Sequence, residues 1–183
     1  MAPRTSSTST RILLSCAAIG VAGGVVAGGS GYLALVLAAI SPVFYGITIG
    51  VHFLPSVVAF ALLRRPGTAL LAGLIAGLVG AAFAPHWLPR LVGTALLVGA
   101  LIELPFLVTR YKRWDAWMFY LAAIVAGVGI AAVVFVALGG EHFAAWMWAV
   151  ALPLYAGSPA LFTWLGRLIA KQLERAGVAR GLR

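Results

Sequence analysis

Acidic residues and cysteines are scarce in this chain of 183 residues. Four Asp and Glu stand against 13 Lys and Arg, and the single cysteine, Cys16, excludes an intramolecular disulfide. Charged residues make up 9% of the sequence, whereas hydrophobic residues make up 63% and the mean hydropathy is +1.06. A soluble domain of this length cannot bury so much apolar surface. The composition therefore predicts an integral membrane protein.

Motifs that mark common catalytic and metal sites are also missing. The sequence has no HExxH motif, no Cys/His metal spacing and no glycine-rich phosphate loop ending in Lys-Ser or Lys-Thr. We therefore expect no metal, no cofactor and no catalytic residue in this chain. The GGSG segment at residues 28–31 fits the GxSG pattern of intramembrane serine proteases, with Ser30 as nucleophile. It follows the first apolar run instead of starting a later one, so a protease is only an alternative.

Six apolar runs are long enough to cross a bilayer, since a helical crossing needs roughly 20 mainly apolar residues. They cover about residues 12–28, 43–63, 67–84, 90–109, 116–138 and 143–166. Residues 28–42 are apolar but too short for a further crossing, and we interpret them as a re-entrant or interfacial loop. We predict an all-α bundle of six transmembrane helices over residues 12–166. An N-terminal tail, residues 1–11, precedes it, and a basic tail, residues 167–183, follows it.

The basic residues predict how this bundle is oriented. If the N-terminus is cytoplasmic, all 13 Lys and Arg residues except Arg90 fall on the cytoplasmic side. The positive-inside rule favours that orientation, with both termini in the cytoplasm and the chain in the cell membrane. Because the basic residues lie between or beyond the apolar runs, we expect no binding of nucleic acid. The basic tail is typical of an amphipathic helix that contacts anionic lipid or a partner.

Polar and aromatic residues gather at the predicted outer face, in residues 28–42, 84–90 and 139–143. Such side chains beneath a loop that can act as a lid are typical of a small-molecule pocket. His86, Trp87, Glu141 and Trp146 are the candidates there. Anchoring at the membrane interface explains the aromatic and histidine side chains equally well.

Three further candidates lie inside the apolar runs. A charge near the bilayer centre costs at least ~2.5 kcal/mol, so Glu103 either serves a ligand site, forms a structural hydrogen bond or ties its helix end to Arg110. His52 lies about nine residues into the second run, roughly 13 Å deep at 1.5 Å per residue. It is a ligand contact, a partner of Glu103 or a neutral histidine bonded within the bundle. Tyr155 either lines the cavity or bonds a neighbouring helix.

Small residues recur at every fourth position of the first run. Ala18 and Ala22 form one such pair, and Gly20 and Gly24 form another. In lipid, where no hydrophobic effect drives association, small residues let a second helix approach closely. We predict that a partner helix docks on these four residues. Packing within the same bundle is the alternative.

Residues 44–80 (FYGITIGVHFLPSVVAFALLRRPGTALLAGLIAGLVG) and 91–114 (LVGTALLVGALIELPFLVTRYKRW) resemble the YkoE family. These proteins are substrate-binding S components of energy-coupling factor (ECF) transporters, and they take up thiamine or its hydroxymethylpyrimidine precursor. The resemblance covers the middle third to half of the chain. Its markers are Tyr45-Gly46, Pro55, the RRPG turn at residues 64–67, Gly99, Glu103, Phe106 and the RYKRW end at residues 110–114.

The resemblance implies a six-helix S component that binds a vitamin from outside under a loop. It also implies a transmembrane coupling subunit and two ATPase subunits as partners, so that ATP hydrolysis belongs to other chains and this chain is no enzyme. In the family, small residues of the first helix dock on the coupling subunit, and Ala18 and Ala22 stand at those places.

The chain departs from the family pattern where the substrate is concerned. The pattern has acidic residues in its third helix, whereas this chain has Gly73 and Gly80. Thiamine carries a positive charge and an aminopyrimidine ring, so a site for it needs a carboxylate to balance the charge and aromatic faces for cation–π and stacking contacts. A pocket with fewer acids suits a more neutral or apolar solute, and a stand-alone facilitator is a further alternative. The residues left to bind thiamine are Glu103, Glu141, Trp87, Trp146 and Tyr45.

Overall fold

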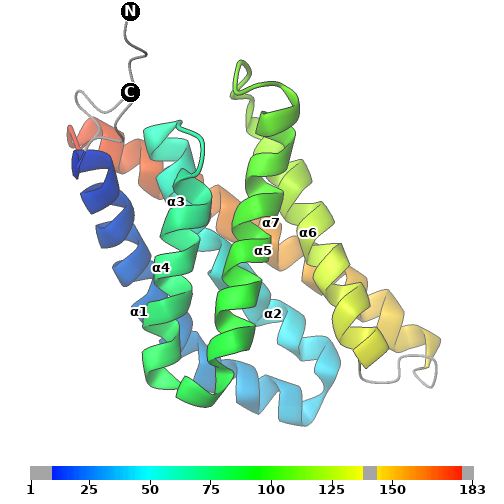
Figure 1. Ribbon diagram of the computed structural model, residues 1–183. Coiled ribbons are helices and arrows are strands. Elements are labelled where there is room, and N and C mark those ends of the chain that lie inside the picture. The colour runs from blue at the N-terminus through cyan, green and yellow to red at the C-terminus, as the bar shows by residue number, and fades with distance from the viewer. Residues whose placement is uncertain (1–9, 138–143, 179–183) are drawn as a thin grey trace, which may run out of the picture.

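The computed structural model describes residues 10–137 and 144–178, and these residues form a bundle of helices (Figure 1). No strand occurs among them. The elements are α1 (Thr10–Ile40), η1 (Pro42–Tyr45), α2 (Gly46–Ile49), η2 (Gly50–Phe53), α3 (Leu54–Leu63), α4 (Thr68–Phe83), η3 (Pro85–Trp87), α5 (Leu88–Val108), α6 (Ala116–Ala137) and α7 (Ala145–Arg175).

Five helical stretches of the described chain are long and apolar enough to cross a membrane. They are Thr10–Ile40, Pro42–Leu63, Pro85–Val108, Ala116–Ala137 and Ala145–Arg175. The apolar helix α4 is shorter, with 16 residues. Large apolar side chains point outward as lipid-facing residues do, and Val108 and Val136 are 76% and 78% exposed. The chain is an all-helical, multi-pass membrane protein.

The two ends of the bundle differ in what they contain. The start of α1, the end of α7, the α3–α4 turn and the α5–α6 loop lie at the end drawn uppermost in Figure 1, here called the upper end. Ile12, Leu62, Leu63 and Ala170 belong to one packed cluster at this end. The later part of α1, η1 and η3 lie at the opposite, lower end (Figure 1). The chain passes between the two ends several times.

The predicted loop over residues 28–42 is wrong, because α1 continues as a helix to Ile40. The prediction ended the first crossing at residue 28, which left a stretch too short for a further crossing. In an apolar environment, however, a helix satisfies its own backbone hydrogen bonds, and that outweighs the poor helix propensity of glycine. Ser30 also donates its hydroxyl to the Ala27 carbonyl at 2.8 Å, within the helix. The lower part of α1 therefore takes the place of the expected loop.

Glycines of α1 let this helix approach α4 closely. A Cβ atom added to Gly20 would lie 2.7 Å from a side-chain carbon of α4, and one added to Gly24 would lie 2.6 Å from another. Because α4 fills both places, the prediction that Gly20 and Gly24 dock a partner helix is wrong, and packing within the bundle accounts for them. Ala18 and Ala22 remain exposed.

The segment from Pro42 to Phe53 is a broken helix whose backbone is completed by α7. The Ser158 hydroxyl accepts from the Gly50 amide at 3.0 Å and donates to the Ile47 carbonyl at 2.7 Å. The Tyr155 hydroxyl donates to the Pro42 carbonyl at 3.3 Å. Irregular backbone at membrane depth persists where neighbouring side chains satisfy its polar groups. Helix α7 thus holds the broken segment in place.

Candidate functional site

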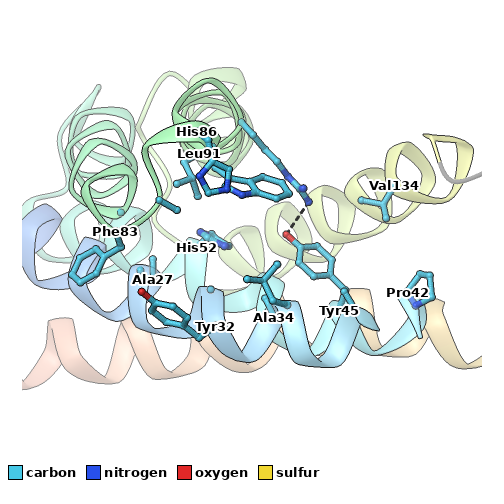
Figure 2. A pocket seen from close by; sticks show the side chains of 18 of the residues that line it. Ala27, Tyr32, Ala34, Pro42, Tyr45, His52, Phe83, His86, Leu91 and Val134 are labelled. Carbon is cyan, nitrogen blue, oxygen red and sulfur yellow. Dashed lines mark hydrogen bonds between the residues drawn. The ribbon is translucent and has the colours of Figure 1, made fainter. Parts of the chain in front are cut away.

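A cavity of about 610 Å³ lies at the lower end of the bundle (Figure 2). Its walls come from the lower part of α1, η1, η2, α4, η3, α5 and α6, so segments distant in sequence enclose one space. Sites for small molecules usually measure roughly 300–1,000 Å³ and are mainly apolar with a few polar groups. The polar and aromatic side chains that line this cavity are Tyr32, Tyr45, His52, Phe83, His86, Trp87 and Arg90.

Arg90 is held on the cavity wall by two aromatic residues. Its Nη2 donates to the Tyr45 hydroxyl at 3.2 Å, drawn as the dashed line in Figure 2. The guanidinium carbon lies 4.5 Å from the Trp87 ring centroid and 5.6 Å from that of Tyr45, within cation–π range. Pro89 suits the first turn of α5, and one turn of helix brings Trp87 and Arg90 to the same side. The cavity therefore carries a positive charge at its wall.

His52 projects into the cavity from η2 (Figure 2). Its ring forms no hydrogen bond with the part of the chain that the structure describes. The prediction that His52 is hydrogen-bonded within the bundle is therefore not supported by the described residues. A neutral imidazole has one donor and one acceptor. His52 can therefore bond a polar group of a ligand deep in the cavity.

The cavity brings together four of the residues predicted from the sequence: Tyr45, His52, His86 and Trp87. Tyr155 is buried behind the wall, where its ring faces Gly46 and its hydroxyl supports Pro42. Trp146 is 60% exposed and does not line the cavity. Glu141 lies outside the described residues.

Glu103 lies at the upper end and does not line the cavity, which favours the structural hydrogen bond among the roles predicted for it. The side chain is 5% exposed, and Oε1 accepts from the backbone amides of Ala69 at 2.9 Å and Leu70 at 3.3 Å. Oε2 accepts from the Gly67 amide at 2.8 Å and from the Tyr111 hydroxyl at 3.3 Å. A carboxylate from α5 thus caps the first turn of α4, where free amides and the helix dipole favour a negative charge. These contacts are those of a structural cap.

The same carboxylate affects Tyr111, which follows α5. Burial, the negative charge of Glu103 and the hydrogen bond to it together raise the pKa of Tyr111 above its ordinary value of 10. Tyr111 therefore stays protonated and keeps donating to Glu103. The bond fixes the α5–α6 loop to the cap of α4.

Sequence reasoning missed Arg90 and Tyr32 as cavity residues. Arg90 was interpreted only as the basic residue on the outer side, although an isolated cation between Trp87 and an apolar run was a signal for a site. Tyr32 lies in the stretch predicted to be a loop. Ser30, the nucleophile of the protease alternative, does not line the cavity and bonds only the Ala27 carbonyl among described residues. No cluster of three or more His, Cys, Asp or Glu that could hold a metal occurs in residues 10–137 and 144–178.

Comparisons with known proteins agree with this geometry. A family model described as "ABC-type cobalt transport system, permease component" matches residues 12–129. The chain is 27% identical over 142 residues to YkoE of Bacillus subtilis (strain 168), which is named as a permease protein for HMP (hydroxymethylpyrimidine) and thiamine. The aligned region covers 77% of this chain and 71% of that protein. A crystal structure of an S component of an ECF transporter superposes with a TM-score of 0.85 at 25% identity, covering 96% of this chain and 90% of that one.

These matches confirm the resemblance to YkoE-type S components that the sequence indicated. The chain is therefore a member of the family of permease components of ABC-type cobalt transport systems, with the fold of an ECF transporter S component.

Proposed function

We propose that this chain is the substrate-binding subunit of an ECF-type importer and that its cavity captures an aminopyrimidine compound of the HMP/thiamine kind. The observation that carries the proposal is the cavity of about 610 Å³, with Tyr45, His52 and Trp87 on its walls. The name of the Bacillus subtilis relative supports the choice of ligand.

The cavity offers what a flat heteroaromatic ring needs. Trp87 and Tyr45 present aromatic faces, and an aromatic pair contributes about 0.5–1.5 kcal/mol beyond the buried area. His52 supplies a hydrogen-bond donor or acceptor for the polar edge of the ring. Apolar side chains form most of the remaining wall and exclude water from the bound ring. These liners include Ala27, Leu35, Phe83, Leu91 and Val134.

We further propose that the upper end faces the cytoplasm, so that the cavity opens to the outside. The α3–α4 turn, the α5–α6 loop and the end of α7 hold most of the basic residues, whereas Arg90 lies at the lower end. The positive-inside rule supports this orientation. It also makes α4, about 24 Å long at 1.5 Å per residue, the sixth crossing.

A second hollow supports docking of a coupling subunit. An apolar groove of about 600 Å³ runs between α1, α3 and α7, and the exposed residues Ala18 and Ala22 line it. Small residues let a transmembrane helix approach closely. We propose that a helix of the coupling subunit occupies this groove and that two ATPase subunits bind that complex from the cytoplasm. Larger side chains of the groove are Leu14, Val26, Leu54, Pro55, Val58, Ile169 and Leu173.

The proposal is tested first by binding. The purified chain is titrated with hydroxymethylpyrimidine and thiamine by calorimetry, and we expect saturable binding of at least one of them at a single site. Mutating Trp87 to Ala should weaken binding more than tenfold. If the folded protein binds neither compound, the proposed ligand class is wrong.

Uptake tests the division of labour between subunits. Cells that make this chain with a coupling subunit and ATPases should accumulate the labelled ligand, and cells that make this chain alone should not. Saturable uptake by the isolated chain would contradict the S-component mechanism and support a facilitator.

A further inference from the structure

We propose that Arg90 determines the charge of the ligand and that it restricts this cavity to pyrimidine compounds without a positive charge. The inference rests on the proposed function and deepens it, because the name of the Bacillus subtilis relative mentions both HMP and thiamine, and the inference distinguishes between them. Thiamine contains a permanently charged thiazolium ring, whereas hydroxymethylpyrimidine is neutral at pH 7.

The first observation is that a hydrogen bond and two cation–π contacts hold the exposed side chain of Arg90 at the cavity wall. Its guanidinium is bonded to the Tyr45 hydroxyl at 3.2 Å and lies 4.5 Å from the Trp87 ring centroid. These two rings are also the aromatic faces on which a flat ligand would stack. A ring bound beside Trp87 and Tyr45 therefore lies next to this cation.

The second observation is that no carboxylate on the described wall offsets this charge. The chain has four acidic residues. Glu103 is occupied by the cap of α4, Asp115 precedes α6 at the upper end, and Glu174 lies in the last turns of α7. None of these three lines the cavity. Glu141, outside the described residues, is addressed below with its own variant.

The third observation is that the wall near Arg90 donates hydrogen bonds more readily than it accepts them. A guanidinium has five N–H donors and no acceptor, and one donor is used on Tyr45. The Tyr45 oxygen accepts that bond, so its own O–H is directed elsewhere and forms no bond within the described chain. A ligand that presents acceptor atoms, such as the ring nitrogens of a pyrimidine, complements these donors.

The size of the effect follows from the repulsion between like charges. For two cations about 6 Å apart at an effective dielectric constant of about 40, between the values for a protein surface and for water, the repulsion corresponds to roughly a tenfold loss of affinity. Thiamine and hydroxymethylpyrimidine differ in size as well as charge. The charge is therefore tested with thiamine and a neutral isostere of it, in which a carbon atom replaces the thiazolium nitrogen.

The experiment measures the affinity of the purified full-length chain for thiamine, its neutral isostere and hydroxymethylpyrimidine. We expect the wild-type protein to bind the isostere about tenfold more tightly than thiamine. Arg90→Gln should bring the two affinities within about twofold of each other, and Arg90→Lys should keep the difference. The ratio is the readout, so a general loss of affinity in a variant does not mimic the result.

Glu141→Gln provides the control for the acidic residue that the structure does not describe. If Glu141 offset the charge of Arg90, this variant would prefer the isostere more strongly than the wild type does; we expect the ratio to stay within about twofold of the wild-type ratio. A wild-type protein that binds thiamine as tightly as the isostere, or an Arg90→Gln variant with an unchanged ratio, would overturn the inference and leave the proposed function standing. If the folded wild-type protein binds none of the three compounds, the proposed function fails and the inference fails with it.

Discussion

The Arg90 guanidinium and the Tyr45 hydroxyl, 3.2 Å apart, join the start of α5 to the broken segment that follows α1. This bond connects two walls of the cavity that are 45 residues apart in sequence. We therefore expect the two residues to act on the proposed ligand as a pair, so that changing either one alters binding.

Tyr45→Phe keeps the aromatic face and removes the hydroxyl. Because the Tyr45 O–H is free to donate to the ligand and such a hydrogen bond contributes about 1 kcal/mol, we expect roughly a fivefold loss of affinity for hydroxymethylpyrimidine. Calorimetric titration measures the change. Tyr120→Phe, on α6 away from the cavity wall, is the matched control and should bind as the wild type does. Equal affinities in all three proteins would exclude a role for the Tyr45 hydroxyl.

Gly80→Asp should increase the affinity of the cavity for positively charged ligands. Gly80 lines the cavity, and a Cβ atom there would meet only the Gly24 carbonyl at 3.8 Å, so a side chain fits. A carboxylate in this place attracts a positive ligand and offsets Arg90. We expect thiamine to gain about tenfold in affinity relative to its neutral isostere. Gly80→Asn, which has the same shape without the charge, is the control and should leave the ratio unchanged.

Glu103→Ala should destabilise the protein without changing the ligand preference. The substitution removes the acceptor of three backbone amides at the start of α4 and of the Tyr111 hydroxyl. Loss of a charged cap that is buried should lower the free energy of unfolding by about 2–3 kcal/mol. Thermal unfolding in detergent gives the measurement, and Glu103→Gln should lose less. If the folded Glu103→Ala variant selectively lost thiamine binding, Glu103 would instead be a ligand-binding residue.

Ala22→Leu should block the partner without affecting the ligand. The larger side chain fills the groove between α1, α3 and α7 where Ala22 is exposed. We expect co-purification with the coupling subunit to fall at least fivefold, while affinity for the pyrimidine stays within twofold. Val25→Leu alters an exposed residue of α1 outside the groove and serves as the control. Undiminished co-purification of Ala22→Leu would place the partner on another face.

Composition and the spacing of apolar runs were sufficient to predict an all-helical membrane protein. The same reasoning misplaced residues 28–40, because it ended the first crossing at residue 28 and found the remaining stretch too short for another, whereas one helix continues to Ile40. It recognised His86 and Trp87 because they stand together in a short polar turn. It gave no information on the 2.8 Å bond from Glu103 to Gly67, since those residues are 36 positions apart.

The sequence predicted only some of the residues that line the cavity, because the rest depend on how the helices pack. His52 was a candidate because it is polar within an apolar run, and Tyr45 because the family resemblance and the need for aromatic faces pointed to it. Tyr155 fits the same description but supports the wall from behind. Which side of a helix faces a hollow depends on how several helices pack. One apolar run considered alone does not contain that information.

Adjacent residues of α1 serve the two hollows of the molecule, since Val26 lines the groove and Ala27 lines the cavity. A subunit that shifts this helix moves a wall of the ligand site at the same time. Thermodynamic reciprocity then applies: by whatever factor the bound pyrimidine changes the affinity for the partner, the partner changes the affinity for the pyrimidine. If the proposed partner docks in the groove, release of the ligand and assembly of the transporter are thus coupled through α1.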